Sequence, residues 1–127
     1  MDKIVISTDK APAAIGPYSQ ALRLGNLIFT SGQIPADPAS GEIAAGGVEP
    51  QARQAFKNLE EVLKAAGASL DNVLKTTVFI KNMDDFAVIN GIYAQFFNAV
   101  YPARSCVEAA RLPKDVLVEI EAVAYIP

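Results

Sequence analysis

Alternating apolar and polar positions predict six strands in this chain. The predicted strands cover residues 4–7, 18–24, 27–34, 73–81, 104–110 and 116–126. In the second of them Ser19, Ala21 and Arg23 alternate with Tyr18, Gln20, Leu22 and Leu24, which is typical of a strand. Gly25 and Asn26 form a turn signal, so the second and third strands are expected to make a hairpin.

Two segments show helical spacing instead. The first covers residues 48–66, with Pro50 in its first turn and Gly67 placed to end it. Its apolar stripe is Val48, Ala52, Phe56, Leu59, Val62, Leu63 and Ala66. The second helix is expected to be capped by Asp84 or Asp85 and stopped by Pro102. Its apolar stripe is Phe86, Ile89, Tyr93, Phe96, Phe97 and Val100.

The order of elements is therefore β-β-β-α-β-α-β-β, which predicts one α+β domain over residues 1–127. We expect a mixed sheet with the two helices covering one face. The last two strands, 104–110 and 116–126, are expected to form a hairpin through a turn at 112–115.

The last strand predicts what lies on each face of that sheet. The residues of one parity are all apolar and should pack under the helices: Val116, Val118, Ile120, Ala122, Ala124 and Ile126. The opposite parity mixes carboxylates with apolar groups: Leu117, Glu119, Glu121, Val123 and Tyr125. A face in contact only with water would not need those apolar side chains, so we expect a subunit interface that carries a site.

Composition narrows the class of protein. The 127 residues are 51% hydrophobic and 20% charged, which is typical of a globular domain, and the net charge of −3 makes nucleic acid an improbable main partner. No apolar run is long enough for a membrane span. The N-terminal residues do not resemble a signal or transit peptide, so we expect a cytoplasmic protein.

The chain has no histidine and one cysteine, which limits the chemistry. A Ser-His-Asp triad, a Cys-His pair and an imidazole acid or base are excluded, and no metal site is expected. The glycines form neither a GxGxxG nor a P-loop motif. Chemistry is left to carboxylates, Arg, Lys, Tyr, hydroxyls, the thiol and the backbone.

Arg104 and either Glu119 or Glu121 form the most informative pair. On a hairpin they would lie near each other, but the register that decides which Glu is nearer is open. One reading is a structural ion pair, and the other is a guanidinium that binds a substrate carboxylate through two hydrogen bonds. Cys106, two residues from Arg104, is more typical of a small buried residue than of a nucleophile.

Other positions have a functional and a structural reading as well. Tyr18 follows Gly16 and Pro17, and either contacts a ligand or anchors a loop. Ser31 and Gly32 end a strand with small residues, which either lets a ligand approach the backbone or forms a bulge. Asn90 adjoins the apolar stripe of the second helix, as a site residue or as a surface residue.

These residues lie within motifs that resemble the RidA/YjgF family. The motifs are AAIGPYSQ at 13–20, TSGQIP at 30–35, KTTVFI at 75–80, DFAVIN at 85–90, YPARSCVEAARLPKD at 101–115 and EIEA at 119–122. The resemblance covers essentially the whole chain, and the block around Arg104 is its most specific part. It implies a chorismate-mutase-like fold and a homotrimer around a central barrel, with the sites at the subunit interfaces.

The resemblance also implies an activity. It is the hydrolysis of reactive 2-imino acids or their enamine tautomers, such as 2-iminobutanoate and 2-iminopropanoate, to 2-oxo acids and ammonia, without a cofactor. Arg104 would bind the substrate carboxylate and Glu119 would hold the attacking water. The pocket would be lined by Tyr18, Ser31, Gly32, Asn90 and Cys106, the last mainly through its backbone.

This chemistry suits a site without histidine, because an imine carbon is already electrophilic and needs little beyond a positioned water. We expect a nearby Arg to lower the pKa of Glu119 and keep it ionised. Three other classes of function stay open. One is a regulatory module that binds 2-oxo acids, the second is RNA cleavage or translation inhibition, as attributed to some family members, and the third is a holdase role after oxidative modification, which the resemblance also allows.

Overall fold

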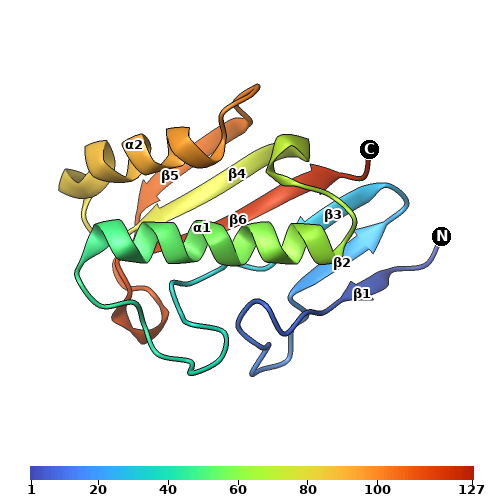
Figure 1. The fold of residues 1–127 in the computed structure, drawn as a ribbon, viewed down its shortest axis with the longest axis horizontal. Coiled ribbons are helices and arrows are strands. Elements are labelled where there is room, and N and C mark those ends of the chain that lie inside the picture. The colour runs from blue at the N-terminus through green and yellow to red at the C-terminus, as the bar shows by residue number, and fades with distance from the viewer.

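The computed structural model describes residues 1–127 and has one mixed six-stranded sheet in the order β1-β2-β3-β6-β4-β5 (Figure 1). The strands are β1 (Ile4–Ile6), β2 (Ala21–Leu24), β3 (Leu27–Thr30), β4 (Val73–Ile80), β5 (Ala103–Glu108) and β6 (Val118–Tyr125). The helices are α1 (Val48–Ala65) and α2 (Phe86–Phe96), with single 3-10 turns at Leu70–Asn72, Met83–Asp85 and Pro113–Asp115. Only β4 and β5 pair in parallel. The predicted α+β domain with two helices is confirmed.

The predicted hairpin of the last two strands is wrong, because β4 lies between β5 and β6. β6 pairs with both β3 and β4, and every second residue along it is buried. β5 has no fully buried residue and takes the edge of the sheet. The more apolar strand therefore occupies the centre, where it buries more surface.

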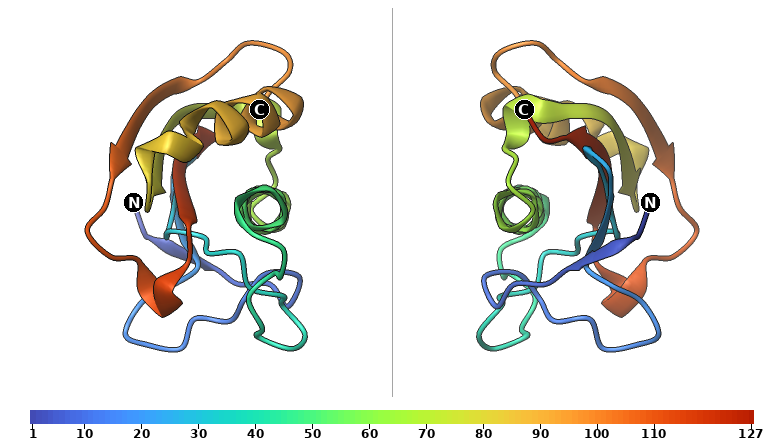
Figure 2. Two further views of the ribbon diagram at one scale, coloured as in Figure 1. Left: turned by 90° about the vertical axis from the view of Figure 1, so that its left-hand side faces the viewer. Right: turned by 90° about the vertical axis from the view of Figure 1, so that its right-hand side faces the viewer.

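Both helices cover the same face of the sheet, and the core lies between them and β6 (Figure 2). As predicted, the apolar parity of the last strand faces this core, and Val116, Val118, Ile120 and Ala124 are completely buried. Phe56 of α1 lies edge-on to the rings of two α2 residues, Tyr93 and Phe96, which joins the helices.

Helix α1 begins and ends as its sequence predicts. Pro50 lies in its first turn, and Gly67 has a positive φ of 91° just beyond its end. The N–H of Ala68 donates to the carbonyl of Leu63, and the N–H of Gly67 donates to that of Lys64. This double hydrogen bond is the Schellman arrangement, in which Gly avoids the strain of a Cβ.

Helix α2 differs from its prediction at both ends. Asp85 takes the N-cap position as predicted, but its side chain makes no capping hydrogen bond; instead Asn82 accepts a hydrogen bond from the N–H of Asp84 and starts the preceding 3-10 turn. The helix stops at Phe96, well before Pro102, so Val100 is 87% exposed and lies outside the apolar stripe.

The face of the sheet away from the helices carries exposed apolar side chains. Val5, Phe29 and Val107 lie on it with 64%, 46% and 42% of their surface exposed, and Val123 and Tyr125 lie on it partly buried. We refer to this side as the open face. Its apolar character agrees with the expected interface, while the homotrimer and its central barrel stay predictions. Neither helix has the length and apolar character that crossing a bilayer requires.

Candidate functional site

Arg104 is held in place by one face of helix α2. Its Nη1 donates a hydrogen bond of 2.7 Å to Oδ1 of Asn90. Its guanidinium carbon lies 5.4 Å from the ring centre of Phe86 and 4.8 Å from that of Tyr93. These three residues are spaced four and three apart, so they form one stripe along the helix. The stripe orients a charged group that would otherwise sample many conformers.

No acidic side chain forms an ion pair with Arg104 within the chain. The ion pairs are found elsewhere, on α1 and in the turn before β6. The reading of Arg104 as one half of an ion pair with Glu119 or Glu121 is therefore wrong for the single chain. Four of the five N–H bonds of the guanidinium are left for another acceptor.

The sheet register explains why the expected pair does not form. On β4, Thr76 pairs with Arg104 on one side and with Ala122 on the other, so all three point toward the helices. Glu119 and Glu121 alternate with those positions on β6 and point to the open face. Arg104 and the two glutamates thus lie on opposite faces of the same sheet.

A hollow of about 430 Å³ opens beside the guanidinium. It is lined by Asn90, Tyr93, Ala94, Tyr101, Pro102 and Arg104. A small carboxylate would meet a fixed cation there with aromatic and aliphatic walls around it. Such a guanidinium suits carboxylate binding through two parallel hydrogen bonds.

Gly32 provides the space for the carboxylate of Glu119. A Cβ on Gly32 would come 1.8 Å from Oε2 of Glu119 and 2.8 Å from its carboxyl carbon. These distances are far below any van der Waals contact, so only glycine admits this position of the carboxylate. The small residues predicted that a ligand could approach the backbone here; in the structure the Glu119 carboxylate makes that approach.

The backbone bulges at this point. Phe29 pairs with Val123 and Gln33 with Ile120, so β3 has one residue more than β6 between the two pairs. Inside the bulge Ser31 donates from its Oγ to the carbonyl of Ser19 at 2.6 Å. The small side chains of Ser31 and Gly32 therefore accompany both the backbone bulge and the close approach of the Glu119 carboxylate.

Burial raises the pKa of Glu119, and the charge of Glu121 raises it further. The expected lowering by a nearby Arg is wrong for the single chain, because Arg104 lies on the other face of the sheet. A carboxylate with a raised pKa is a stronger base than an exposed one.

A second hollow, of about 590 Å³, opens over this carboxylate. It is lined by Ile15, Tyr18, Ser31, Gly32, Ile34, Pro113, Lys114, Glu119 and Glu121. Tyr18 stands at this hollow with 52% of its surface exposed, as a side chain that contacts a ligand would. Three of the residues expected around the water, Tyr18, Ser31 and Gly32, therefore lie together.

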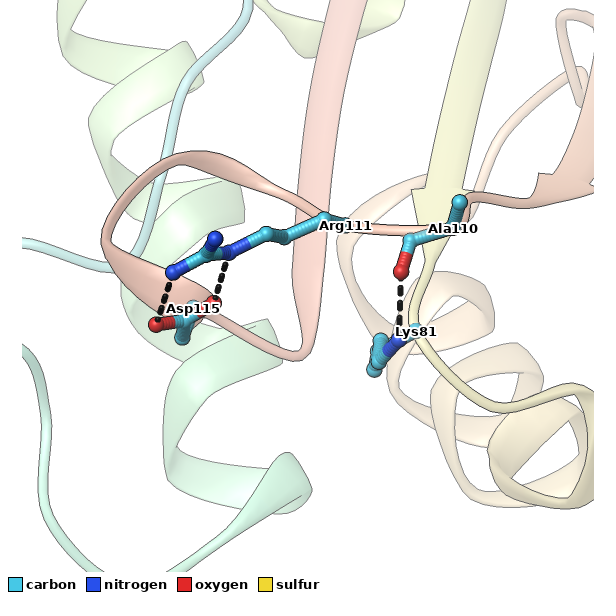
Figure 3. A network of polar contacts seen from close by, with 4 residues as sticks. All are labelled: Lys81, Ala110, Arg111 and Asp115. Atoms are coloured by element: carbon cyan, nitrogen blue, oxygen red, sulfur yellow. Dashed lines mark hydrogen bonds and ion pairs between the residues drawn. The ribbon is translucent and has the colours of Figure 1, made fainter.

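The turn before β6 places Lys114 at the edge of this second hollow. In the same turn Arg111 donates to both carboxylate oxygens of Asp115, at 2.7 and 3.1 Å, and nearby Lys81 donates to the carbonyl of Ala110 (Figure 3). Lys114 and Asp115 both have a φ of 55°, which is uncommon for residues with a Cβ. The turn at 112–115 was predicted, but its positive φ angles were not, since no glycine marks this backbone.

Cys106 shares the face of Arg104, since both alternate with the residues of β5 that point to the open face. Burial raises the pKa of its thiol more than the charge of Arg104 lowers it. The thiolate is therefore disfavoured, which agrees with a lining rather than a nucleophilic role. No three His, Cys, Asp or Glu side chains are grouped so that they could hold a metal ion.

The predicted site residues thus fall into two half-sites. Asn90, Arg104 and Cys106 form the guanidinium half-site on the helix side. The carboxylate half-site lies toward the open face and consists of Tyr18, Ser31, Gly32 and Glu119, with Glu121 beside it. Sequence reasoning missed Phe86 and Tyr93 as contacts of Arg104, although their spacing from Asn90 is a signal that could have found them.

The chain is similar in sequence and fold to several known proteins. Residues 8–126 match the family model described as Endoribonuclease L-PSP. The 2-iminobutanoate/2-iminopropanoate deaminase of Escherichia coli K12 is 56% identical over 122 residues, which are 94% of each chain. The crystal structure of the YjgF gene product from E. coli has a TM-score of 0.93 at 53% identity and covers 98% of this chain and 99% of that one. E. coli TdcF with bound serine has the same TM-score and identity over 96% of this chain and 98% of that one.

Proposed function

Because the chain belongs to the RidA/YjgF family, whose model is described as Endoribonuclease L-PSP, we propose that it hydrolyses reactive 2-imino acids. The substrates would be 2-iminobutanoate, 2-iminopropanoate and their enamine tautomers, and the products 2-oxo acids and ammonia. One observation carries the proposal: Arg104 is an oriented guanidinium with no acidic partner in the chain, at the edge of a small hollow. A 2-imino acid carries the carboxylate that this group would bind.

The complete site is proposed to form between two copies of the chain. Arg104 and Glu119 point to opposite faces of one sheet, so one copy cannot present both to one small substrate. A second copy that contacts the open face can bring its Arg104 toward the Glu119 of the first. We therefore propose a homotrimer, built around a central barrel of sheets, with three sites at its interfaces.

The reaction would use two anchoring contacts. Arg104 binds the substrate carboxylate with two hydrogen bonds and orients C2 of the imine. Glu119 accepts a hydrogen bond from a water molecule and directs its oxygen at C2. The water adds across the C=N bond, the resulting amino alcohol loses ammonia, and the C=O bond of the 2-oxo acid forms.

The remaining lining residues would support these contacts. Asn90 holds the guanidinium through Oδ1, and Tyr18 closes the carboxylate half-site. Ser31 fixes the bulge and Gly32 makes room for Glu119, while Cys106 contributes its backbone. No metal, flavin or pyridoxal phosphate takes part in these steps, because a protonated imine needs no further activation for water to attack.

A trapping assay tests the activity. An amino-acid oxidase generates the imine in the presence of semicarbazide, which captures whatever imine survives. Wild-type protein should lower the amount of trapped adduct in proportion to its concentration. Unchanged adduct at all protein concentrations would exclude the deaminase activity.

A pair of arginine variants tests the role of Arg104. Arg104→Ala should abolish the effect, since the carboxylate loses its partner. Arg53→Ala is the matched control, because Arg53 forms an ordinary exposed ion pair with Glu49 on α1. Equal activity of the two variants would overturn the role given to Arg104, and binding of 2-oxobutanoate without turnover would indicate a regulatory module instead.

A further inference from the structure

The Arg104 guanidinium packs on the ring of Tyr93, which extends into the core. Tyr93 has no part in the reaction steps above. The ring of Tyr93 lies 4.8 Å from the guanidinium carbon. Its hydroxyl shares a hydrogen bond of 2.8 Å with the hydroxyl of Thr76, and both side chains are buried. The contact thus links a partly buried cation to a fixed position in the interior.

Thr76 can influence the Arg104 side chain through its hydrogen bond to the Tyr93 hydroxyl. It is completely buried in the middle of β4 and pairs directly with Arg104 in the sheet. Arg104 therefore receives its backbone position from the strand that carries Thr76, and its side-chain position from the ring that Thr76 holds. β4 therefore contributes to the backbone position of Arg104 directly and to its side-chain position through Thr76 and Tyr93.

Neighbouring aromatic residues fix the ring from its other sides. Phe56 meets Tyr93 edge-on with ring centres 5.9 Å apart, and Phe97 packs against it at 4.4 Å. A ring held by two aromatic neighbours and a hydrogen bond has little freedom to turn. Such rigid support is what keeps a binding group in its productive geometry.

We infer that Tyr93, held by Thr76, is a positioning residue that presents the Arg104 guanidinium to the carboxylate of the ligand. The inference rests on the proposed function for the identity of that ligand. The guanidinium carbon lies over the Tyr93 ring, and the hydrogen bond from Nη1 to Asn90 fixes the guanidinium at a second point. Binding then costs little side-chain entropy, and the affinity for a carboxylate rises.

Three variants and one control test this role. Tyr93→Leu removes the ring, Tyr93→Phe keeps the ring and removes the hydroxyl, and Thr76→Val keeps the volume of Thr76 without its hydroxyl. Phe96→Leu is the control: Phe96 lies on the same helix and packs on Phe56, but the guanidinium is not over its ring. The control thus loses an aromatic contact with Phe56, as Tyr93→Leu does, without removing a ring beneath the guanidinium.

Steady-state kinetics of imine hydrolysis should separate positioning from stability. We expect Tyr93→Leu to raise KM about tenfold with kcat within about twofold of wild type. Tyr93→Phe and Thr76→Val should raise KM about threefold, and Phe96→Leu should leave it unchanged. If Tyr93→Leu does not fold, the two conservative variants still decide the question.

Two further readouts do not depend on turnover. The Nε–H proton of Arg104 should exchange with solvent faster in Tyr93→Leu than in Phe96→Leu, as observed by NMR. The affinity for 2-oxobutanoate should fall in the same order as the rise in KM. A wild type without deaminase activity would refute the proposed function, while the exchange rate would still test the positioning role. Unchanged KM and exchange in the Tyr93 and Thr76 variants, or equal changes in Phe96→Leu, would refute the inference.

Discussion

At the scale of single residues, Gly32 matters because a carboxylate occupies the space where its side chain would be. Gly32→Ala should push the Glu119 carboxylate aside, since the added Cβ would come 1.8 Å from Oε2. A displacement of this size should lower kcat/KM about 100-fold. The trapping assay measures the loss, and circular dichroism shows whether the fold persists.

The matched control for this substitution is Gly91→Ala. Gly91 lies on α2, and an added Cβ there meets no atom within 4 Å. Its activity should stay close to wild type. Full activity of Gly32→Ala would contradict the position that we assign to Glu119.

Glu121 provides a prediction about pH. Its negative charge contributes to the raised pKa of Glu119, although burial is the larger cause. Glu121→Gln should lower the pKa of Glu119, so Glu119 stays ionised, and able to direct water, at lower pH. The acid limb of the kcat/KM profile should move down by about half a pH unit.

The pH profile needs a control for the loss of one negative charge. Glu60→Gln removes a partly exposed carboxylate of α1 whose only ion pair is a long one of 3.9 Å with Lys64. That variant should keep the wild-type acid limb. A shift toward higher pH in Glu121→Gln would show that Glu119 titrates under another influence.

At the scale of elements, two glycines make opposite predictions for stability. Gly67→Ala forces a Cβ into a backbone with φ of 91°, so the free energy of unfolding should fall by about 1 kcal/mol. Gly91→Ala adds a helix-favouring residue in open space, so the same quantity should rise by about 0.5–1 kcal/mol. Urea unfolding of both variants at one protein concentration measures the difference, and equal shifts would argue against the assigned end of α1.

The sequence predicted an element most accurately where the residues that define it are near neighbours in the chain. Pro50 and Gly67 mark the two ends of α1, and the alternation in the last strand identifies the buried face. The end of α2 was predicted too late, because Val100 continues the apolar spacing beyond the last helical residue. Apolar spacing alone does not distinguish a helix from an exposed loop with the same residues.

At the scale of the whole molecule, a site formed by two copies allows two inactive variants to complement each other. Arg104→Ala lacks one half-site and Glu119→Gln lacks the other. Co-expressed in equal amounts, they should recover about a quarter of the wild-type activity, because a random trimer leaves that share of sites complete. The purified mixture is assayed by imine trapping, and light scattering gives its mass.

Each variant alone supplies the baseline for this experiment. Activity that never exceeds the sum of the two baselines would argue that both half-sites act within one copy. A monomeric mass would contradict the proposed assembly directly.

The candidate site was predictable as a list of residues but not as an arrangement. Arg104, Asn90 and Glu119 stand in specific motifs of the sequence, and the structure places each beside a hollow. The alternation of the last strand already placed Glu119 away from the helices, but the face of Arg104 was not predictable, because it follows from the register of β5 with β4. Phe86 and Tyr93 were assigned to the core, since a ring that packs under an arginine has the same sequence signal as any buried ring.

By itself the sequence determined the elements, the buried parity of the last strand and the chemistry that a chain without histidine allows, because these depend on residues that are near neighbours in the chain. Only the tertiary structure decided which strands pair and in which register. Both depend on contacts between segments far apart in the sequence, as where β6 lies between β3 and β4. The register of β4 with β5 and β6 leaves Arg104 on the helix side, while Glu119 lies on the open face, and it is the physical reason to propose that two copies share one site.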